Sequence, residues 1–167
     1  MHCVTDIEVE EWLYEREIPK DPYHHDSSPE LYMQFHAPAN HRRLDAFTRH
    51  YYERIIPESD SLVHMTDWGH YQESEMIAVL GIRSTHGDNR MLIDAPGHTL
   101  TWGQREIGIS LFSLTASFAW TSYLYSAQNR STLFNWEGEI FDFWTDDEEA
   151  IGEMKLVLKD FELAETK

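Results

Sequence analysis

The hydrophobic pattern is densest between residues 107 and 144. From Ile107 to Trp136 the chain has seven large aromatic side chains, and Arg130 is the only charged residue in that interval. Such a segment must be buried over most of its length, because soluble proteins rarely expose an apolar patch of that size. The pattern therefore predicts that the core of the fold is built from this stretch.

Two periodicities compete in the first part of the stretch. Ile107, Leu111 and Leu114 recur at helical spacing, but residues 112–120 also alternate between apolar and small polar side chains, as a strand does. A strand that ran unbroken from 112 to 127 would far exceed the usual length of roughly 5–6 residues. We therefore predict a helix over 104–118 and a strand that begins near Trp120.

Turn-forming residues divide the rest of the stretch into three short apolar segments. The segments are 122–127, 132–136 and 139–144, and polar residues or Glu137-Gly138 separate them. Short alternating runs joined by turns are typical of an antiparallel meander. Ile140, Asp142 and Trp144 fall on one face of the last segment and two phenylalanines on the other. Helices must therefore cover at least one face of this meander.

The apolar periodicity also predicts elements on both sides of the central stretch. These are a helix within 4–18, a strand over 31–36, a helix from the N-cap Asn40 to Ile55, a short strand over 62–66 and a helix over 146–160. Thr145 and Glu148 have the spacing of a capping box at the start of the last helix. Residues 76–82 are apolar on both faces, which is typical of a central strand. Residues 85–90 would then join that strand to 91–95 as a hairpin, and 95–103 would form a loop.

Length and cysteine content set the fold class. A chain of 167 residues can bury a sizeable core without disulfides, and its single cysteine, Cys3, excludes an internal disulfide and a multi-cysteine zinc site. We predict one α+β domain over 1–167, with a mainly antiparallel sheet of about five to seven strands packed by about three helices. Phe118, Trp120, Phe134 and Phe141 are expected to be buried.

The amino-terminal residues carry no targeting signal. They include neither a basic segment nor the hydrophobic segment of a signal peptide, and no run reaches the roughly 18 apolar residues of a membrane span. These features favour a cytoplasmic protein.

The formal net charge of −17 is distributed unevenly along the chain. Residues 1–30 carry nine acidic and two basic side chains, residues 31–136 carry ten and eight, and residues 137–167 carry eleven and three. This distribution argues against nucleic-acid binding, which needs a basic surface, and against docking on an anionic membrane. Two interpretations remain: the acidic ends serve solubility, or they attract a basic partner protein.

The candidate binding residues are the acidic side chains near the carboxyl end. They are Glu137, Glu139, Asp146, Asp147, Glu148, Glu149 and Glu153. If the last helix lies on the surface, these carboxylates would form one negative patch, and opposed charge would accelerate the encounter with a basic protein.

Histidines provide the competing hypothesis. His64, Asp67 and His70 have the side chains of a transition-metal site, as does the cluster His24-His25-Asp26. A three-residue spacing is geometrically specific only on a helix, however, and Asp67-Trp-Gly69 is typical of a turn. We therefore interpret these histidines as scattered surface residues and expect no metal or other cofactor.

No catalytic motif emerges from the remaining residues. The chain has neither a Gly-x-Ser-x-Gly elbow nor a phosphate-binding Gly-Lys-Ser/Thr motif. Carboxylate pairs such as Glu137 with Glu139 are expected by chance among 30 acidic residues. We therefore expect a non-catalytic intracellular protein that binds a basic protein, comparable in size and charge to inhibitor or immunity proteins. The alternative is a small enzyme or ligand-binding protein that uses His64 and His70, or a pocket beneath Trp102.

Overall fold

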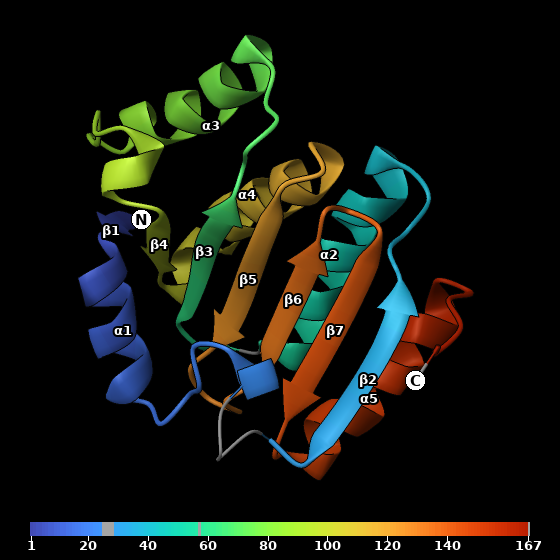
Figure 1. The fold of residues 1–167 in the computed structure, drawn as a ribbon. Coiled ribbons are helices and arrows are strands. Elements are labelled where there is room, and N and C mark those ends of the chain that lie inside the picture. Colours follow the sequence, from blue (N-terminus) through green and yellow to red (C-terminus); the bar gives the residue numbers. More distant parts are fainter. Residues whose placement is uncertain (25–28, 57, 167) are drawn as a thin grey trace.

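The computed structural model describes residues 1–24, 29–56 and 58–166, and within these ranges it has an α+β fold, as predicted. Seven strands form one antiparallel sheet in the order β1-β4-β3-β5-β6-β7-β2 (Figure 1). The strands are β1 (His2–Val4), β2 (Leu31–His36), β3 (Ser61–Asp67), β4 (Gly97–Leu100), β5 (Thr121–Ser126), β6 (Thr132–Trp136) and β7 (Ile140–Thr145). The helices are α1 (Asp6–Tyr14), α2 (His41–Ile55), α3 (Glu73–Thr85), α4 (Arg105–Ser117) and α5 (Glu148–Asp160).

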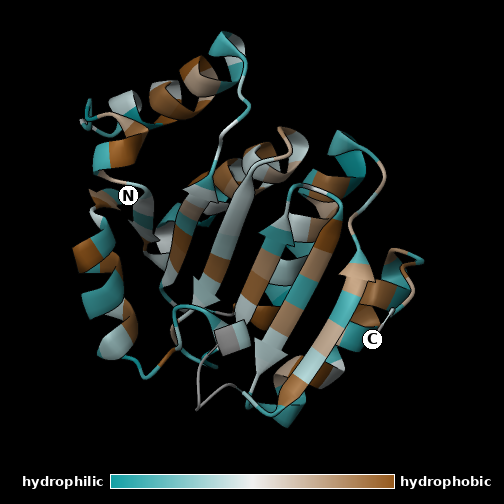
Figure 2. Ribbon diagram, in the orientation of Figure 1, coloured by the Kyte–Doolittle hydropathy of each residue, from teal (hydrophilic) through white to brown (hydrophobic). Residues whose placement is uncertain are grey.

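The two faces of the sheet have different coverings. Helices α2, α4 and α5 lie behind the sheet in Figure 1, and we call the side that they cover the helix face. Alternate residues of the central strands, among them Leu124, Leu133 and Phe141, point to this side and are fully buried. The other side, the open face, is covered by α1 over β1, β4 and β3 and is crossed at its lower end by residues 15–24 (Figure 1). Figure 2 shows the resulting alternation of hydrophobic and hydrophilic positions along β6 and β7.

The predictions for the central stretch are confirmed. Helix α4 occupies 105–117, and the chain reverses at Ala119, whose positive φ of 56° ends the helix. The meander of β5, β6 and β7 follows, in a register that pairs Tyr123 with Phe134 and Phe134 with Asp142. Burial of both the helix and the meander explains why the whole stretch is so apolar.

A tight turn joins β6 to β7. Three residues, 137–139, connect the paired ends Trp136 and Ile140. Glu137 and Gly138 both have positive φ, of 51° and 70°, as in the type I′ turns that suit twisted hairpins. A Cβ on Gly138 would lie 2.1 Å from the carbonyl oxygen of Ala116, so the turn packs directly on the end of α4. The tip of this hairpin is therefore held rigidly.

Most outer elements also agree with the sequence. Thr5 and Glu8 form a reciprocal capping box at the start of α1, and Asn40 caps α2 by accepting a hydrogen bond from the amide of Arg43 at 3.0 Å. Strands β2 and β3 occupy the predicted segments. Helix α5 is capped by Asp147 instead of Thr145, because Thr145 is the last residue of β7.

The predictions for residues 73–103 are largely wrong. Residues 76–82 lie in α3 instead of a central strand, and 91–95 contain a short 3-10 turn instead of the second strand of a hairpin. The expected loop at 95–103 contains β4, which pairs with β3 and with the unpredicted strand β1. A capping box between Gln72 and Glu75 starts α3, and this local hydrogen bonding favours the helix over the strand.

Three of the four aromatic residues expected in the core are buried. Trp120 and Phe141 are buried on the helix face, and Phe134 is buried on the open face. Phe118 is only partly buried, which corrects the prediction, because it follows the last turn of α4 at the margin of the core. Its ring packs against Trp120 with centroids 5.6 Å apart.

Candidate functional site

The candidate site lies on the open face over β5, β6 and β7. In the part of the chain that the structure describes, α1 is the only α-helix on this face, and it lies over the opposite half of the sheet (Figure 1). A short 3-10 helix, Pro22–His24, lies against β6 and β7 through Tyr23. The upper ends of β5, β6 and β7 therefore present side chains directly from the sheet. Strands hold such side chains more rigidly than loops do.

An aromatic band crosses this half of the open face. Antiparallel pairing sets open-face side chains opposite one another, so that the rings of Tyr123 and Phe134 lie 4.5 Å apart. Tyr125 stacks on Tyr123 at 5.5 Å, while Tyr32 lies 5.3 Å from Trp144. The band thus continues from β5 across β6 and β7 to β2.

Asp142 lies beneath this band and is fully buried. Its carboxylate accepts hydrogen bonds from the hydroxyl of Tyr23, from the hydroxyl of Tyr32 at 2.5 Å and from the amide of Gln34 at 2.9 Å. Burial, and secondarily the bond to Asp142, raises the pKa of both tyrosines, so they remain protonated donors at neutral pH. The cluster ties the loop at Tyr23 and the edge strand β2 to β7.

A pocket of about 300 Å³ lies beside the band, and we call it the aromatic hollow. Its walls are the rings of Tyr123 and Phe134, the side chains of Thr66 and Thr121, and Lys20, Asp21 and His64. The Lys20 ammonium is 2.7 Å from the carboxylate of Glu10. The hollow therefore combines an aromatic floor with polar side chains at its rim.

His64 is buried, and its Nε2 lies 3.0 Å from the carboxylate of Asp6. Burial lowers the pKa of His64 and outweighs the opposing effect of Asp6, so the imidazole is neutral at pH 7. The expected surface position of this histidine is therefore wrong. His64 is a packed residue whose Nε2–H donates to Asp6.

The trio His64, Asp67 and His70 does not come together as a metal site. Asp67 accepts a hydrogen bond from the amide of Gly69 at 2.8 Å, and His70 is exposed in the loop before α3. Within residues 1–24, 29–56 and 58–166, no group of three histidine, cysteine or acidic side chains is placed to hold a metal ion. Residues 25 and 26 of the other histidine cluster lie outside the described ranges.

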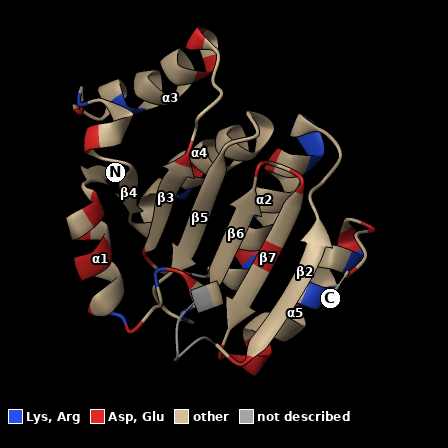
Figure 3. Cartoon of the chain, viewed as in Figure 1, with Lys and Arg blue, Asp and Glu red and all other residues tan. Residues whose placement is uncertain are grey.

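The structure divides the predicted acidic patch into two groups. Glu137 and Glu139 lie at the turn between β6 and β7, whereas residues 146–149 lie at the opposite end of β7 (Figure 3). Asp147 caps α5 by accepting from the amide of Glu149 at 2.8 Å, and Glu153 forms an ion pair with Arg54 at 2.8 Å. The acidic residues near the carboxyl end therefore do not form one surface.

The upper group surrounds an exposed tryptophan. Trp136 ends β6 with 52% of its surface exposed, and it pairs in register with Ile140. Glu137 and Glu139 complete a shallow hollow of about 130 Å³ with these two residues. We call Trp136, Glu137, Glu139 and Ile140 the Trp136 end. Because Trp136 and Phe134 share one face of β6, this end is continuous with the aromatic hollow.

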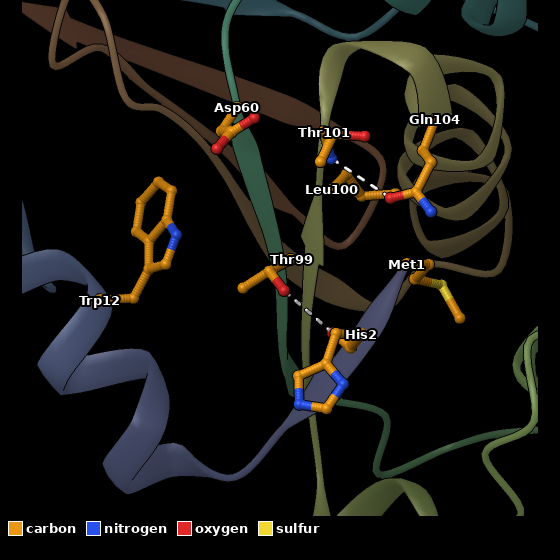
Figure 4. A pocket seen from close by; sticks show the side chains of 8 residues that line it. All are labelled: Met1, His2, Trp12, Asp60, Thr99, Leu100, Thr101 and Gln104. Atoms are coloured by element: carbon orange, nitrogen blue, oxygen red, sulfur yellow. Dashed lines mark hydrogen bonds between the residues drawn. The ribbon is translucent and has the colours of Figure 1, made fainter.

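A second groove lies near Trp102, where the alternative hypothesis placed a pocket. It measures about 290 Å³, and Figure 4 shows Trp12 and Asp60 on one side of it and Gln104 on the other. The Thr99 hydroxyl donates to the carbonyl of His2 at 3.2 Å, and the Thr101 amide donates to the Gln104 side chain at 3.2 Å. These polar groups therefore form hydrogen bonds within the local segments that line the groove.

A buried polar cluster lies under α3. Arg83 is fully buried, and its guanidinium forms an ion pair with Asp88 across 3.6 Å. Cys3 lies close to both residues, and burial raises the pKa of its thiol. Burial, together with the charge of Arg83, lowers the pKa of the neighbouring His98 to about 3. The thiol of Cys3 is thus kept protonated and shielded from solvent, which is the opposite of what a nucleophile needs.

Residues of the aromatic band were not predicted as a site. The alternation of Thr132, Phe134 and Trp136 does indicate that the last two share one face of β6. No helix in the described ranges is long and apolar enough to span a bilayer. No family model matches the chain, and comparisons with curated proteins and with solved structures found no significant match.

Proposed function

We propose that this protein is a non-catalytic binding protein that holds a basic protein partner against the Trp136 end of the open face. The observation that carries the proposal is the exposed indole of Trp136, which lines one hollow with Glu137 and Glu139 at the end of the β6–β7 hairpin. The proposal keeps the basic partner expected from the charge distribution, and of the predicted acidic residues it keeps Glu137 and Glu139 as the contact.

The chemistry of this end suits a protein contact. Tryptophan is among the residue types that most often dominate binding energy, provided that it enters a pocket from which water is excluded. Ile140 beside it adds apolar area, and the aromatic hollow extends that area along β6 and β5. A partly exposed tryptophan on a preorganised strand loses little conformational freedom on binding.

The two glutamates determine the charge of the partner. Glu137 and Glu139 flank the indole, and no ion pair to either is found among the described residues. Opposed charges at the rim of an interface increase the association rate by about 10–10³-fold, and the gain falls with ionic strength. A basic partner surface is therefore favoured.

The polar groups of the open face support a non-catalytic role. Asp142 is occupied by three donors, and the Nε2 of His64 is occupied by Asp6. Asp142 is therefore not presented to a ligand as a free acid or base, which general acid–base catalysis requires. The Nδ1 of His64 has no hydrogen-bond partner among the described residues, but it is buried from solvent.

The proposal is tested by measuring how strongly and how fast a captured partner binds to variants at both ends of β7. Proteins that bind the immobilised chain from a native lysate at low salt are identified, and the partner is then purified for binding kinetics. We expect Trp136→Ala to weaken the affinity by about 30-fold or more, as removal of a central aromatic anchor does. Glu137→Lys with Glu139→Lys should slow association by about 10-fold and reduce its dependence on salt.

The matched control carries Glu148→Lys and Glu149→Lys at the other end of β7. This double variant changes the net charge by the same amount but leaves the Trp136 end intact, so its association rate should stay within about 2-fold of the wild-type rate. A partner that is not basic would overturn the proposal. It would also be overturned if the two double variants changed the association rate equally, or if Trp136→Ala left the affinity unchanged.

A further inference from the structure

We infer that the aromatic hollow is the receptor for a lysine or arginine side chain of the partner. This inference rests on the proposed function and assigns the hollow a specific ligand chemistry. It follows from three features of the hollow, namely its position, its aromatic floor and the sign of the charges around it.

The position of the hollow makes it part of the same contact. Phe134 forms its floor and lies two residues from Trp136 on the same face of β6. Thr121 at its rim begins β5, the strand that pairs with β6. A partner that packs on Trp136 therefore covers the mouth of the hollow. The volume of about 300 Å³ lies at the lower end of the range for ligand pockets, which suits a single side chain.

The floor favours a cation. The rings of Tyr123 and Phe134 lie 4.5 Å apart and tilt by 32° from one another, so they form a continuous aromatic surface. A guanidinium or ammonium group over such a surface is attracted by the negative faces of the rings, and the attraction grows as water is excluded. The hydroxyl oxygens of Thr66 and Thr121 add hydrogen-bond acceptors at the rim.

The surrounding charges act in the same direction. Asp21 lines the hollow, and Asp142 is the register neighbour of Phe134 with donors that are all neutral. The pKa of Tyr123 is raised to about 12, first by burial and then by the charges of Asp21 and Asp142. The negative potential that retains this phenolic proton also stabilises a cation in the hollow.

Two further groups of the hollow do not oppose this assignment. Lys20 is positively charged, but its ammonium is paired with Glu10 at 2.7 Å. His64 is neutral, because burial lowers its pKa. Neither group therefore adds an unpaired positive charge to the hollow.

The inference can be tested without the partner, with acetyl-arginine amide as the probe. Its binding is followed by NMR of the Tyr123 and Phe134 rings at low salt, against acetyl-norleucine amide as the uncharged control. We expect saturable shifts with a dissociation constant in the millimolar range, the strength typical of a ligand of this size. The uncharged control should bind about 10-fold more weakly, and about 0.5 M salt should weaken the arginine probe several-fold.

Two variants separate this inference from the proposed function. Thr121→Lys places a cation at the rim and should remove binding of the probe, whereas Glu148→Lys with Glu149→Lys, at the other end of β7, should leave it within about 2-fold. Absence of ring shifts, or equal binding of the uncharged control, would overturn the inference without affecting the Trp136 test. Binding of the probe, combined with a partner affinity insensitive to Trp136→Ala, would support the hollow and overturn the proposed function instead.

Discussion

Asp142 and Arg83 are both charged side chains without solvent exposure, but their surroundings differ. Asp142, on the open face, accepts three hydrogen bonds from Tyr23, Tyr32 and Gln34. Arg83, in the last turn of α3, has no hydrogen-bond partner among the described residues for any of its three guanidinium nitrogens, and its ion pair with Asp88 spans 3.6 Å. A buried charge is destabilising by several kcal/mol unless hydrogen bonds offset the loss of water.

This difference indicates which parts of the fold are tightly held. The Asp142 cluster joins three segments that are far apart in the sequence, so the strands beneath the proposed binding surface are locked together. Helix α3 is held by apolar contacts such as those of Val79 and by a poorly satisfied arginine. We therefore expect α3 to open locally before the strands around Asp142 do.

The largest effect is expected at Asp142. Asp142→Ala removes the acceptor of three hydrogen bonds to a charged group, and we expect the free energy of unfolding to fall by about 2–3 kcal/mol in a denaturant melt. Tyr32→Phe removes only one of the three donors and should lower it by about 1 kcal/mol. A loss below about 0.5 kcal/mol for Asp142→Ala would show that the cluster does not hold the open face together.

The strands that carry Asp142 could be predicted because their signals are local. Periodicity and turn residues both mark α4, β5, β6 and β7, and alternation already sets Asp142 and Trp144 on one face. Helix α3 was missed because residues 76–82 are apolar all round, a pattern that a buried strand and a packed helix share. Gln72 and Glu75, with Arg83 in the last turn, are helix signals that could have identified it.

The site was harder to predict because its residues converge from distant segments. Tyr23, Tyr32 and Asp142 meet only through the long-range pairing of β2 with β7. The predicted acidic patch shows the opposite relation between sequence and structure. Glu139 and Asp146 are close in the sequence, but six residues of extended strand separate them in space. At about 3.3 Å per residue, β7 places them roughly 20 Å apart.

The second effect concerns two buried histidines, His64 on the open face and His98 in the cluster around Arg83. Burial lowers the pKa of His64, beside Asp6 and Lys20, and lowers the pKa of His98, beside Arg83 and Asp88, to about 3. The unfolded chain takes up these protons near pH 6.5, whereas the folded chain takes them up only at lower pH. The stability is therefore fully present above about pH 6.5 and falls as the pH decreases, by up to about 1.4 kcal/mol per pH unit for each histidine.

We expect the free energy of unfolding to be about 2 kcal/mol lower at pH 5.5 than at pH 7.5. The carboxyl groups with lowered pKa, such as Asp88 and Glu106, titrate in the unfolded chain only near pH 4. They therefore contribute little to the change in stability between pH 5.5 and 7.5. His98→Gln should remove at least half of the pH dependence, whatever its effect on stability at pH 7.5. An unchanged slope in this variant would mean that His98 takes up its proton in the folded state.

The smallest effect is expected at Arg83, and it provides the sharpest contrast with Asp142. Arg83→Met retains much of the buried volume and removes a charge that makes no hydrogen bond, while Asp88 keeps its ion pair with Arg90. Replacement of a poorly satisfied buried ion by an apolar side chain is often neutral or stabilising. We therefore expect a change within about 1 kcal/mol, in the stabilising direction. A loss above about 2 kcal/mol would show that Arg83 is as well satisfied as Asp142, and α3 would then be as firmly held as the strands of the open face.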